Sequence, residues 1–185
     1  MKIFSNKNDL LIWSCKQCKS DKFAALEFGV YTGHSISIIR SYYNGSVYGF
    51  DSFNGLPEFW RDGYSEGHFK TDHIPSIDQV DIVVGLFQDT LEQFLLSLNK
   101  EIDFVHFDAD LYSSTIFCLN KIKNYLHKET IFLFDEYQNY PDWESHEHKA
   151  FMEWLEENPD VSAKRIAEVR NNEQVAFKVT ISTKQ

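Results

Sequence analysis

Short apolar runs alternate along the chain with segments in which apolar residues recur every three or four positions. Each run is typical of a buried strand, and each longer segment is typical of a helix with one apolar face. The predicted strands are Phe23–Phe28, Ser46–Phe50, Val80–Leu86, Ile102–Phe107 and Thr130–Phe134. The helical spacing is carried by Ile36, Ile39 and Tyr43, by Leu91, Phe94, Leu95 and Leu98, and by Ile116, Leu119, Ile122 and Leu126. This alternation predicts a parallel sheet with right-handed crossovers.

Short polar residues mark where several of the predicted helices begin. Their side chains can accept hydrogen bonds from the free N–H groups of a first helical turn. The expected caps are Asn8 or Asp9 for an opening helix that runs to about Cys18, Asp89-Thr90 for the helix after the third strand, and Ser113 or Ser114 for the helix after the fourth.

The last part of the chain departs from the alternation. A helix is expected over Trp143–Glu157, and two alternating runs follow it, Ala163–Val169 and Gln174–Ile181. Asn171-Asn172 between these runs is a hairpin signal. The hairpin would place one antiparallel strand in the sheet, and we expect a single α/β domain over residues 1–185.

The first predicted strand runs into a glycine turn that also begins a helix, Leu26-Glu27-Phe28-Gly29-Val30-Tyr31-Thr32-Gly33-His34-Ser35. Free backbone N–H groups and the helix dipole meet at such a turn, which is typical of a nucleotide-cofactor site. Gly29 permits the sharp turn, and Gly33 lets the backbone approach a ligand. The G-x-x-x-G spacing differs from the G-x-G-x-x-G of a dinucleotide fold. With Glu27 expected to face a cationic or hydroxyl-bearing group, the turn suits S-adenosylmethionine better than NAD.

A second acid, Asp51, ends the second predicted strand, one β-α-β unit after Glu27. Ligands bind at the carboxyl ends of the strands in such sheets, and an acid there accepts hydrogen bonds from ribose hydroxyls. We therefore expect Asp51 to bind the ribose of the cofactor.

Residues 53–78 form the longest irregular stretch and contain glycine, proline and several aromatic residues. A loop of this length within a domain is usually functional or disordered. The aromatic content favours an ordered lid or substrate wall over a linker.

Further acids follow the fourth and fifth predicted strands, Asp108 and Asp110 after one, Asp135 and Glu136 after the other. Carboxylates that crowd together raise one another's pKa unless a cation or a hydrogen-bond donor lies among them. A divalent metal ion with oxygen ligands would satisfy them. The alternative is structural, with Asp108 and Asp135 as strand-end helix caps.

Charge and composition restrict the class of partner. The chain has 18 lysine and arginine residues against 28 aspartate and glutamate residues, a formal charge of −10, so no nucleic-acid or anionic-membrane partner is expected. We see no apolar stretch near ~18 residues and no signal-peptide core, and expect a cytoplasmic protein that acts on a small molecule. Cys15, Cys18 and Cys118 are interpreted as reduced thiols, with half of a zinc site or a redox pair as the alternative for the first two.

The glycine turn, Leu26-Glu27-x-Gly29-x-Tyr31-Thr32-Gly33-x-Ser35, resembles motif I of class I S-adenosylmethionine-dependent methyltransferases, especially their O-methyltransferases. Other blocks resemble the macrocin-type sugar O-methyltransferases: Asp51-Ser52-Phe53-x-Gly55-Leu56-Pro57, Asp89-Thr90-Leu91, Asp108-x-Asp110-Leu111-Tyr112-x-Ser114-Thr115, Asp135-x-Tyr137 and Lys149-Ala150-Phe151. The resemblance runs from about residue 22 to 157. It implies a Rossmann-like three-layer sandwich, with a seven-stranded, mostly parallel sheet whose last strand is reversed. That agrees with the hairpin predicted from the residues.

Carried onto this chain, the resemblance implies roles for particular residues. The cofactor, S-adenosylmethionine, would be bound by Glu27, Phe28, Gly29, Gly33, His34, Ser35, Asp51, Ser52, Gln88, Asp89 and Asp108. Asp51 would bind its ribose, and residues near Gln88 and Asp89 its adenine. A magnesium ion would be held by Asp108, Asp135 and Glu136, the last of which stands where the family has an aspartate. Asp110 would be the general base that removes the proton of the acceptor's hydroxyl, with Asp108 as the second catalytic residue.

Other interpretations remain open at this point. The chain could be a non-catalytic or metal-independent module that binds S-adenosylmethionine. It could also be an NAD-dependent oxidoreductase, although the glycine spacing disfavours this alternative. His146 and His148 lie on different helix faces and are interpreted as structural residues. Tyr137, Tyr140 and Trp143 are equally compatible with stacking on an acceptor ring and with packing at the rim. The acceptor could be a sugar or a phenol, and the chain could form a homo-oligomer; the sequence pattern does not distinguish these alternatives.

Overall fold

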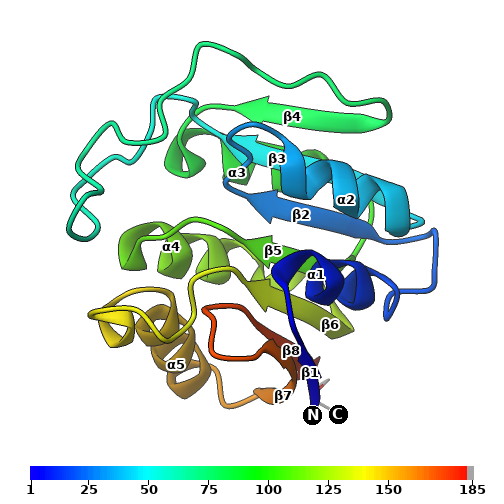
Figure 1. Ribbon diagram of the computed structural model, residues 1–185. Coiled ribbons are helices and arrows are strands. Elements are labelled where there is room, and N and C mark those ends of the chain that lie inside the picture. The colour runs from blue at the N-terminus through cyan, green and yellow to red at the C-terminus, as the bar shows by residue number, and fades with distance from the viewer. Residues whose placement is uncertain (183–185) are drawn as a thin grey trace.

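A computed structural model describes residues 1–182 and contains an eight-stranded sheet between two layers of helices (Figure 1). The strands are β1 (Lys2–Phe4), β2 (Ala24–Phe28), β3 (Ser46–Asp51), β4 (Val80–Val84), β5 (Ile102–Phe107), β6 (Leu126–Phe134), β7 (Val161–Val169) and β8 (Val175–Ile181). Their order in space is β1-β7-β8-β6-β5-β2-β3-β4. Only β8 runs antiparallel to its neighbours within this sheet, which confirms a mostly parallel sheet with a reversed last strand.

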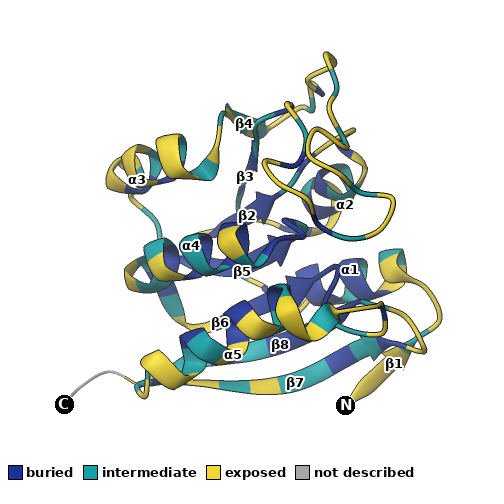
Figure 2. Cartoon of the chain, turned by 90° about the vertical axis from the view of Figure 1, so that its left-hand side faces the viewer, coloured by how far each residue is buried: buried dark blue, intermediate teal, exposed yellow. Residues whose placement is uncertain are grey.

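The helices cover the two faces of the sheet in separate groups (Figure 2). They are α1 (Lys7–Cys15), α2 (His34–Tyr42), α3 (Phe87–Ser97), α4 (Tyr112–Ile122) and α5 (Glu147–Glu157), with short 3-10 helices η1 (Lys123–Tyr125) and η2 (Trp143–Ser145). The apolar faces of α3, α4 and α5 pack in one core cluster, and those of α1 and α2 pack in another. The predicted three-layer sandwich is therefore confirmed.

The central strands are rigid because they are buried on both faces. Every residue of β2 and β5 is buried, including the fully enclosed rings of Phe28, Phe104 and Phe107. Each such side chain stabilises the fold by about 1.5–3 kcal/mol relative to an exposed one. The loops that leave the carboxyl ends of β2 and β5 thus start from fixed positions.

Several element boundaries differ from the prediction. Helix α1 begins earlier, with Asn6 as its cap, because the Asn6 side chain accepts a hydrogen bond from the Asp9 N–H at 2.9 Å. The predicted caps of α3 and α4 are wrong, since these helices begin after Leu86 and Leu111 without a side-chain cap. Their first turns instead pack Phe87 and Tyr112 against the core.

Two further differences concern strands. The predicted number of seven strands is wrong: the sheet has eight, because it gains β1, which is too short to show a pattern and pairs with β7 at one edge. Strand β6 begins at Leu126, where the prediction extends the preceding helix. The hairpin is confirmed, with Asn171 in the left-handed region at φ +56° in the turn between β7 and β8.

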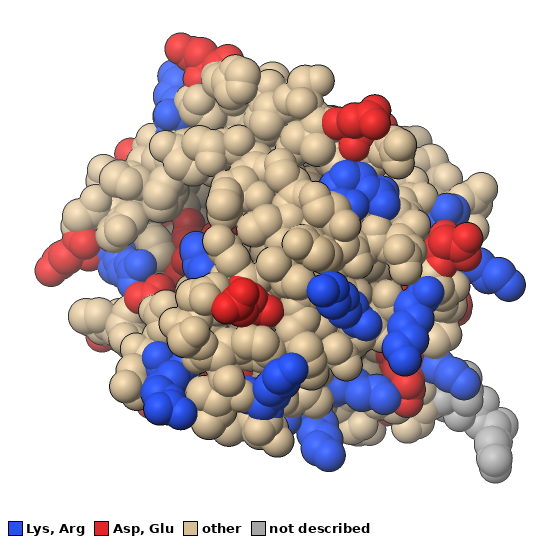
Figure 3. Space-filling model, turned by 45° about the vertical axis from the view of Figure 1, so that its right-hand side comes forward, with Lys and Arg blue, Asp and Glu red and all other residues tan. Residues whose placement is uncertain are grey.

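Charged side chains of both signs reach the surface, as the face in Figure 3 shows. Within residues 1–182, no helix combines the length and the apolar character that a membrane span requires.

Candidate active site

A cavity of about 310 Å³ opens at the carboxyl ends of the strands. Its walls come from the loops after β2, β3, β5 and β6, from the start of α3, and from the long loop between β3 and β4. Among the residues predicted to form the site, it is lined by Gly29, Asp51, Ser52, Gln88, Asp108, Asp110, Asp135 and Glu136. The structure therefore brings most of the predicted site residues together.

A second cavity of about 210 Å³ lies beside the first, toward α1 and α2. Two further predicted residues, His34 and Ser35, line it. Asp108 and Asp135 border both cavities, as does Lys7 at the start of α1. The two cavities are therefore neighbouring parts of one site.

Glu27 does not face either cavity. It is fully buried, and its Oε1 lies 2.8 Å from His106 Nδ1 on the adjacent strand β5. Burial raises the pKa of Glu27, and hydrogen bonds from His106 and Ser35 act in the opposite direction. Glu27 therefore reaches the site only through His106 and Ser35, which both line the second cavity.

Three more predicted residues do not line either of these two cavities. The Phe28 side chain is in the core between Phe50 and Phe107. Gly33 has φ +83°, and a Cβ added there would lie 2.8 Å from the Cβ atom of Pro75. Gly33 therefore packs against the long loop. Asp89 is exposed in the first turn of α3, whereas Gln88 lines the main cavity.

Gly29 is required by two independent features of the turn. Its φ of +94° is in the region that favours glycine. An added Cβ would lie 1.8 Å from the backbone oxygen of Asp108. The glycine thus lets the turn after β2 touch the chain after β5, and it sets the position of Asp108.

Asp51 lines the main cavity and also holds the loops around it. Its Oδ2 accepts hydrogen bonds from the N–H groups of Val30 and Tyr31, both at 2.8 Å. Its Oδ1 accepts from the Phe53 N–H at 2.7 Å. The carboxylate therefore joins the glycine turn to the start of the long loop, in addition to facing the cavity.

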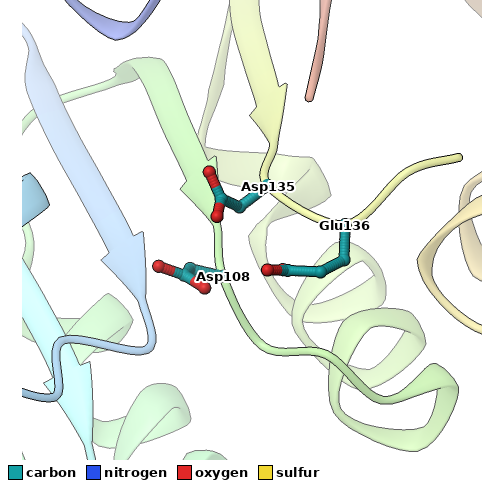
Figure 4. Close-up of side chains that lie close together, drawn as sticks. All are labelled: Asp108, Asp135 and Glu136. Atoms are coloured by element: carbon teal, nitrogen blue, oxygen red, sulfur yellow. The ribbon is translucent and has the colours of Figure 1, made fainter. Parts of the chain in front are cut away.

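Asp108, Asp135 and Glu136 form a compact acid cluster (Figure 4). One oxygen from each lies within 4.8 Å of the others. Asp108 follows β5, Asp135 follows β6, and these strands are paired up to Phe107 and Phe134. The helix-cap alternative is wrong, because the cap of α4 is Leu111 and that of α5 is His146.

Asp108, Glu136 and the neighbouring Asp110 have pKa values raised above the usual range of a carboxyl group. Burial, with repulsion from Asp135, raises the pKa of Asp110 to about 7. Burial and nearby carboxylates raise the pKa of Glu136 well above its usual range. Asp110 also has a backbone φ of +63°, which is unusual outside glycine and typical of functional positions. Burial and mutual repulsion therefore disfavour the ionised forms of these carboxyl groups.

The donor set fits a hard divalent cation. Glu136 Oε2 is buried and accepts no hydrogen bond from an N–H or hydroxyl group within residues 1–182, and the Glu136 carboxyl lies against that of Asp110. A buried polar atom without a partner is costly. Carboxylate oxygens are the ligands that magnesium prefers.

Three residues of the site are not among those predicted from the sequence. The Lys7 Nζ lies 2.8 Å from Asp135 Oδ2. Glu147 is fully buried beneath the cluster, and its carboxylate accepts hydrogen bonds from the Ala109 and Glu136 N–H groups. His106 is a polar residue inside an otherwise apolar strand, and that position is the signal that would have pointed to it.

The long loop forms an ordered aromatic wall. Trp60, Leu56, Leu111 and Tyr140 pack in one buried cluster. The Arg61 guanidinium lies 3.9 Å from the Trp60 ring centre and 4.5 Å from that of Tyr140. This packing agrees with an ordered loop, as predicted, and not with a linker.

The remaining candidates have structural contacts. His146 lies against the rings of Trp60 and Tyr140, and His148 against Trp143. Cys15 and Cys18 are buried free thiols, and burial raises the pKa of each. These contacts agree with the structural interpretations made from the sequence.

A family model described as a methyltransferase domain matches residues 26–137. No curated protein matches the chain. Among solved structures, CalS11, a calicheamicin methyltransferase, has a TM-score of 0.71 at 21% identity over 92% of this chain and 76% of that chain. The O-methyltransferase NovP has a TM-score of 0.65 at 20% identity, over 94% and 79%. A putative rRNA methylase from Clostridium thermocellum has a TM-score of 0.63 at 16% identity, over 98% and 99%. These likenesses show a shared fold.

Proposed function

Because the chain belongs to the methyltransferase domain family, we propose that it is an S-adenosylmethionine-dependent O-methyltransferase acting on a hydroxyl of a small molecule. The observation that carries the proposal is the position of Asp110. This buried acid, with its pKa raised to about 7, lines the same cavity as the Gly29 turn and Asp51. This position supports Asp110 as a base beside the proposed cofactor site.

The cofactor would lie across the glycine turn. Asp51 and Ser52 face the cavity where a ribose would bind, and Gln88 lines it where the adenine would bind. Backbone N–H groups at the start of α2, with His34 and Ser35 nearby, suit the charged methionine end. The cofactor supplies an electrophilic methyl group on its sulfonium.

Asp110 would act as the general base. It accepts the proton of the acceptor's hydroxyl as the oxygen–methyl bond forms and the sulfur–methyl bond breaks, which leaves S-adenosylhomocysteine. A base with a pKa near the working pH is the most effective, because it is both ionised and basic. The buried surroundings that raise the pKa of Asp110 therefore favour this role.

Asp108, Asp135 and Glu136 would hold a magnesium ion, and the unpartnered Glu136 oxygen supports this assignment. Magnesium bound there would supply Lewis acidity toward the acceptor's hydroxyl. Asp108 and Asp135 follow paired strands, which fixes their backbone positions before any ligand binds.

The acceptor would lie against the aromatic wall. Trp60, Tyr64 and Phe69 line the cavity with apolar surface, which suits the face of a sugar or a phenolic ring. A structure of CalS11 is described as a TDP-rhamnose 3'-O-methyltransferase, and we propose a sugar or phenolic hydroxyl as the acceptor here. No observation favours the NAD-dependent alternative.

Isothermal titration calorimetry followed by turnover tests the function. We expect the protein to bind S-adenosylhomocysteine and not NADH, and to transfer labelled methyl groups from S-adenosylmethionine to at least one member of a panel of sugars, phenols and catechols. Excess EDTA should abolish transfer, and added magnesium should restore it. Tight NADH binding without a response to S-adenosylhomocysteine would reject the function. Transfer that is unchanged in EDTA would reject only the metal.

Asp51→Ala should weaken S-adenosylhomocysteine binding by about 2–3 kcal/mol, the range for hydrogen bonds to a charged group. The variant should also unfold at lower temperature, because the carboxylate holds the N–H groups of Val30, Tyr31 and Phe53. Calorimetry and thermal unfolding measure the two effects. Asp81→Ala removes an exposed acid of β4 and should change neither. Unchanged cofactor affinity in the Asp51 variant would refute its assignment to the ribose.

A further inference from the structure

The acid cluster already contains a cation from the chain itself. The Lys7 Nζ lies 2.8 Å from Asp135 Oδ2, and both cavities border on Lys7. The charges of Asp108 and Glu136 also act on this ammonium group. Lys7 thus provides positive charge to the three carboxylates that are proposed to hold magnesium.

The backbone of Lys7 is held in place by its helix, whereas its side chain is free to move. It is the first residue of α1, and this helix is anchored by the buried side chains of Leu10, Leu11 and Cys15. The Lys7 side chain itself is 53% exposed, whereas that of Asp135 is 7% exposed. The ammonium group can therefore leave Asp135 for solvent without any movement of the helix.

We propose that Lys7 is the resident counter-cation of the acid cluster, and that a divalent ion has to displace its ammonium group from Asp135 in order to bind. The inference rests on the metal site of the proposed function. It assigns Lys7 as a positioning residue that lowers the affinity for metal and holds Asp135 when metal is absent.

The geometry supports displacement over simultaneous binding. Asp135 Oδ2 is the oxygen that contacts Lys7, while Oδ1 is turned toward His106, whose Nε2 lies 4.0 Å away. An ion bound to Asp135 would compete with the Lys7 ammonium group, which contacts the same carboxylate directly. Two like charges a few ångströms apart repel strongly in a partly buried site.

Titration of the protein with Mn²⁺ alone, followed by calorimetry, tests this proposal without cofactor or acceptor. Lys7→Met should bind Mn²⁺ at least about tenfold more tightly than the unmodified protein, because a repelling charge within a few ångströms is removed. Lys7→Arg keeps the charge and should bind within about threefold of the unmodified protein. Lys16→Met makes the same charge change at the exposed end of α1, over the Tyr42 ring, and should have no effect beyond about twofold.

Each other result overturns the proposal. Equal Mn²⁺ affinity in Lys7→Met and the unmodified protein rejects displacement, as does the absence of Mn²⁺ binding from both. Weaker S-adenosylhomocysteine binding with unchanged Mn²⁺ affinity would assign Lys7 to the cofactor instead. Thermal unfolding confirms that each variant is folded. The proposed function can fail separately. If the protein shows the predicted Mn²⁺ affinities but transfers no methyl group, the proposed enzymatic function is rejected and the proposed role of Lys7 is retained.

Discussion

Asp110→Asn should slow methyl transfer by about 10²–10⁴-fold, the usual contribution of a general base. The amide is close in size to the carboxylate but cannot accept the hydroxyl proton at the required basicity. S-adenosylhomocysteine binding should stay within about twofold, because the proposed cofactor contacts come from the glycine turn and Asp51. Initial rates with saturating acceptor, together with calorimetry, give the two quantities.

Asp78→Asn is the matched control for this variant. Asp78 is an exposed acid at the end of the long loop, and its replacement makes the same change of charge. It should leave the rate unchanged. If Asp110→Asn reacts as fast as the unmodified protein, the base is another group. If it instead loses cofactor binding, Asp110 belongs to the cofactor site.

Gly29→Ala should destabilise the fold by about 2–5 kcal/mol, which combines the cost of a side chain in a left-handed conformation with that of overpacking. The added Cβ would meet the Asp108 backbone oxygen at 1.8 Å. The turn and the end of β5 would have to separate, so binding of S-adenosylhomocysteine should be lost as well. Urea unfolding and calorimetry measure both effects.

Gly63→Ala separates the two causes. Gly63 has φ +88°, close to that of Gly29, but an added Cβ there meets no atom within 4 Å. This control should therefore lose only about 1–2 kcal/mol, the conformational part. Equal losses in the two variants would show that contact with Asp108 is unimportant at Gly29.

The sheet and the acid cluster could be predicted because both depend on local patterns. Strands such as β5 are buried on both faces and read as apolar runs. Asp108 and Asp135 each follow such a run, and the carboxyl ends of parallel strands meet at one edge of a sheet. The topology of the parallel sheet alone therefore predicts that these two acids lie close together.

Residues whose partners lie far away in sequence could not be predicted in the same way. Nothing near Lys7 indicates that it will contact Asp135. Glu27 was expected to face a ligand, but it is paired with His106 on the neighbouring strand. A charged and a polar residue inside two buried strands require partners, yet only the strand register shows that they meet each other.

The pairing of β1 with β7 has a consequence for how the site is assembled. Lys2 lies opposite Ala167, so this edge of the sheet joins segments that are far apart in sequence. Contacts of such large sequence separation form slowly, because a long loop has to close first. During synthesis the segment that carries Lys7 leaves the ribosome before β7 does, and Lys7 lies 128 positions before Asp135, the acid that it contacts. The acid cluster therefore belongs to a folding sequence in which its own cation is made well before the strand pairing that holds this edge of the sheet.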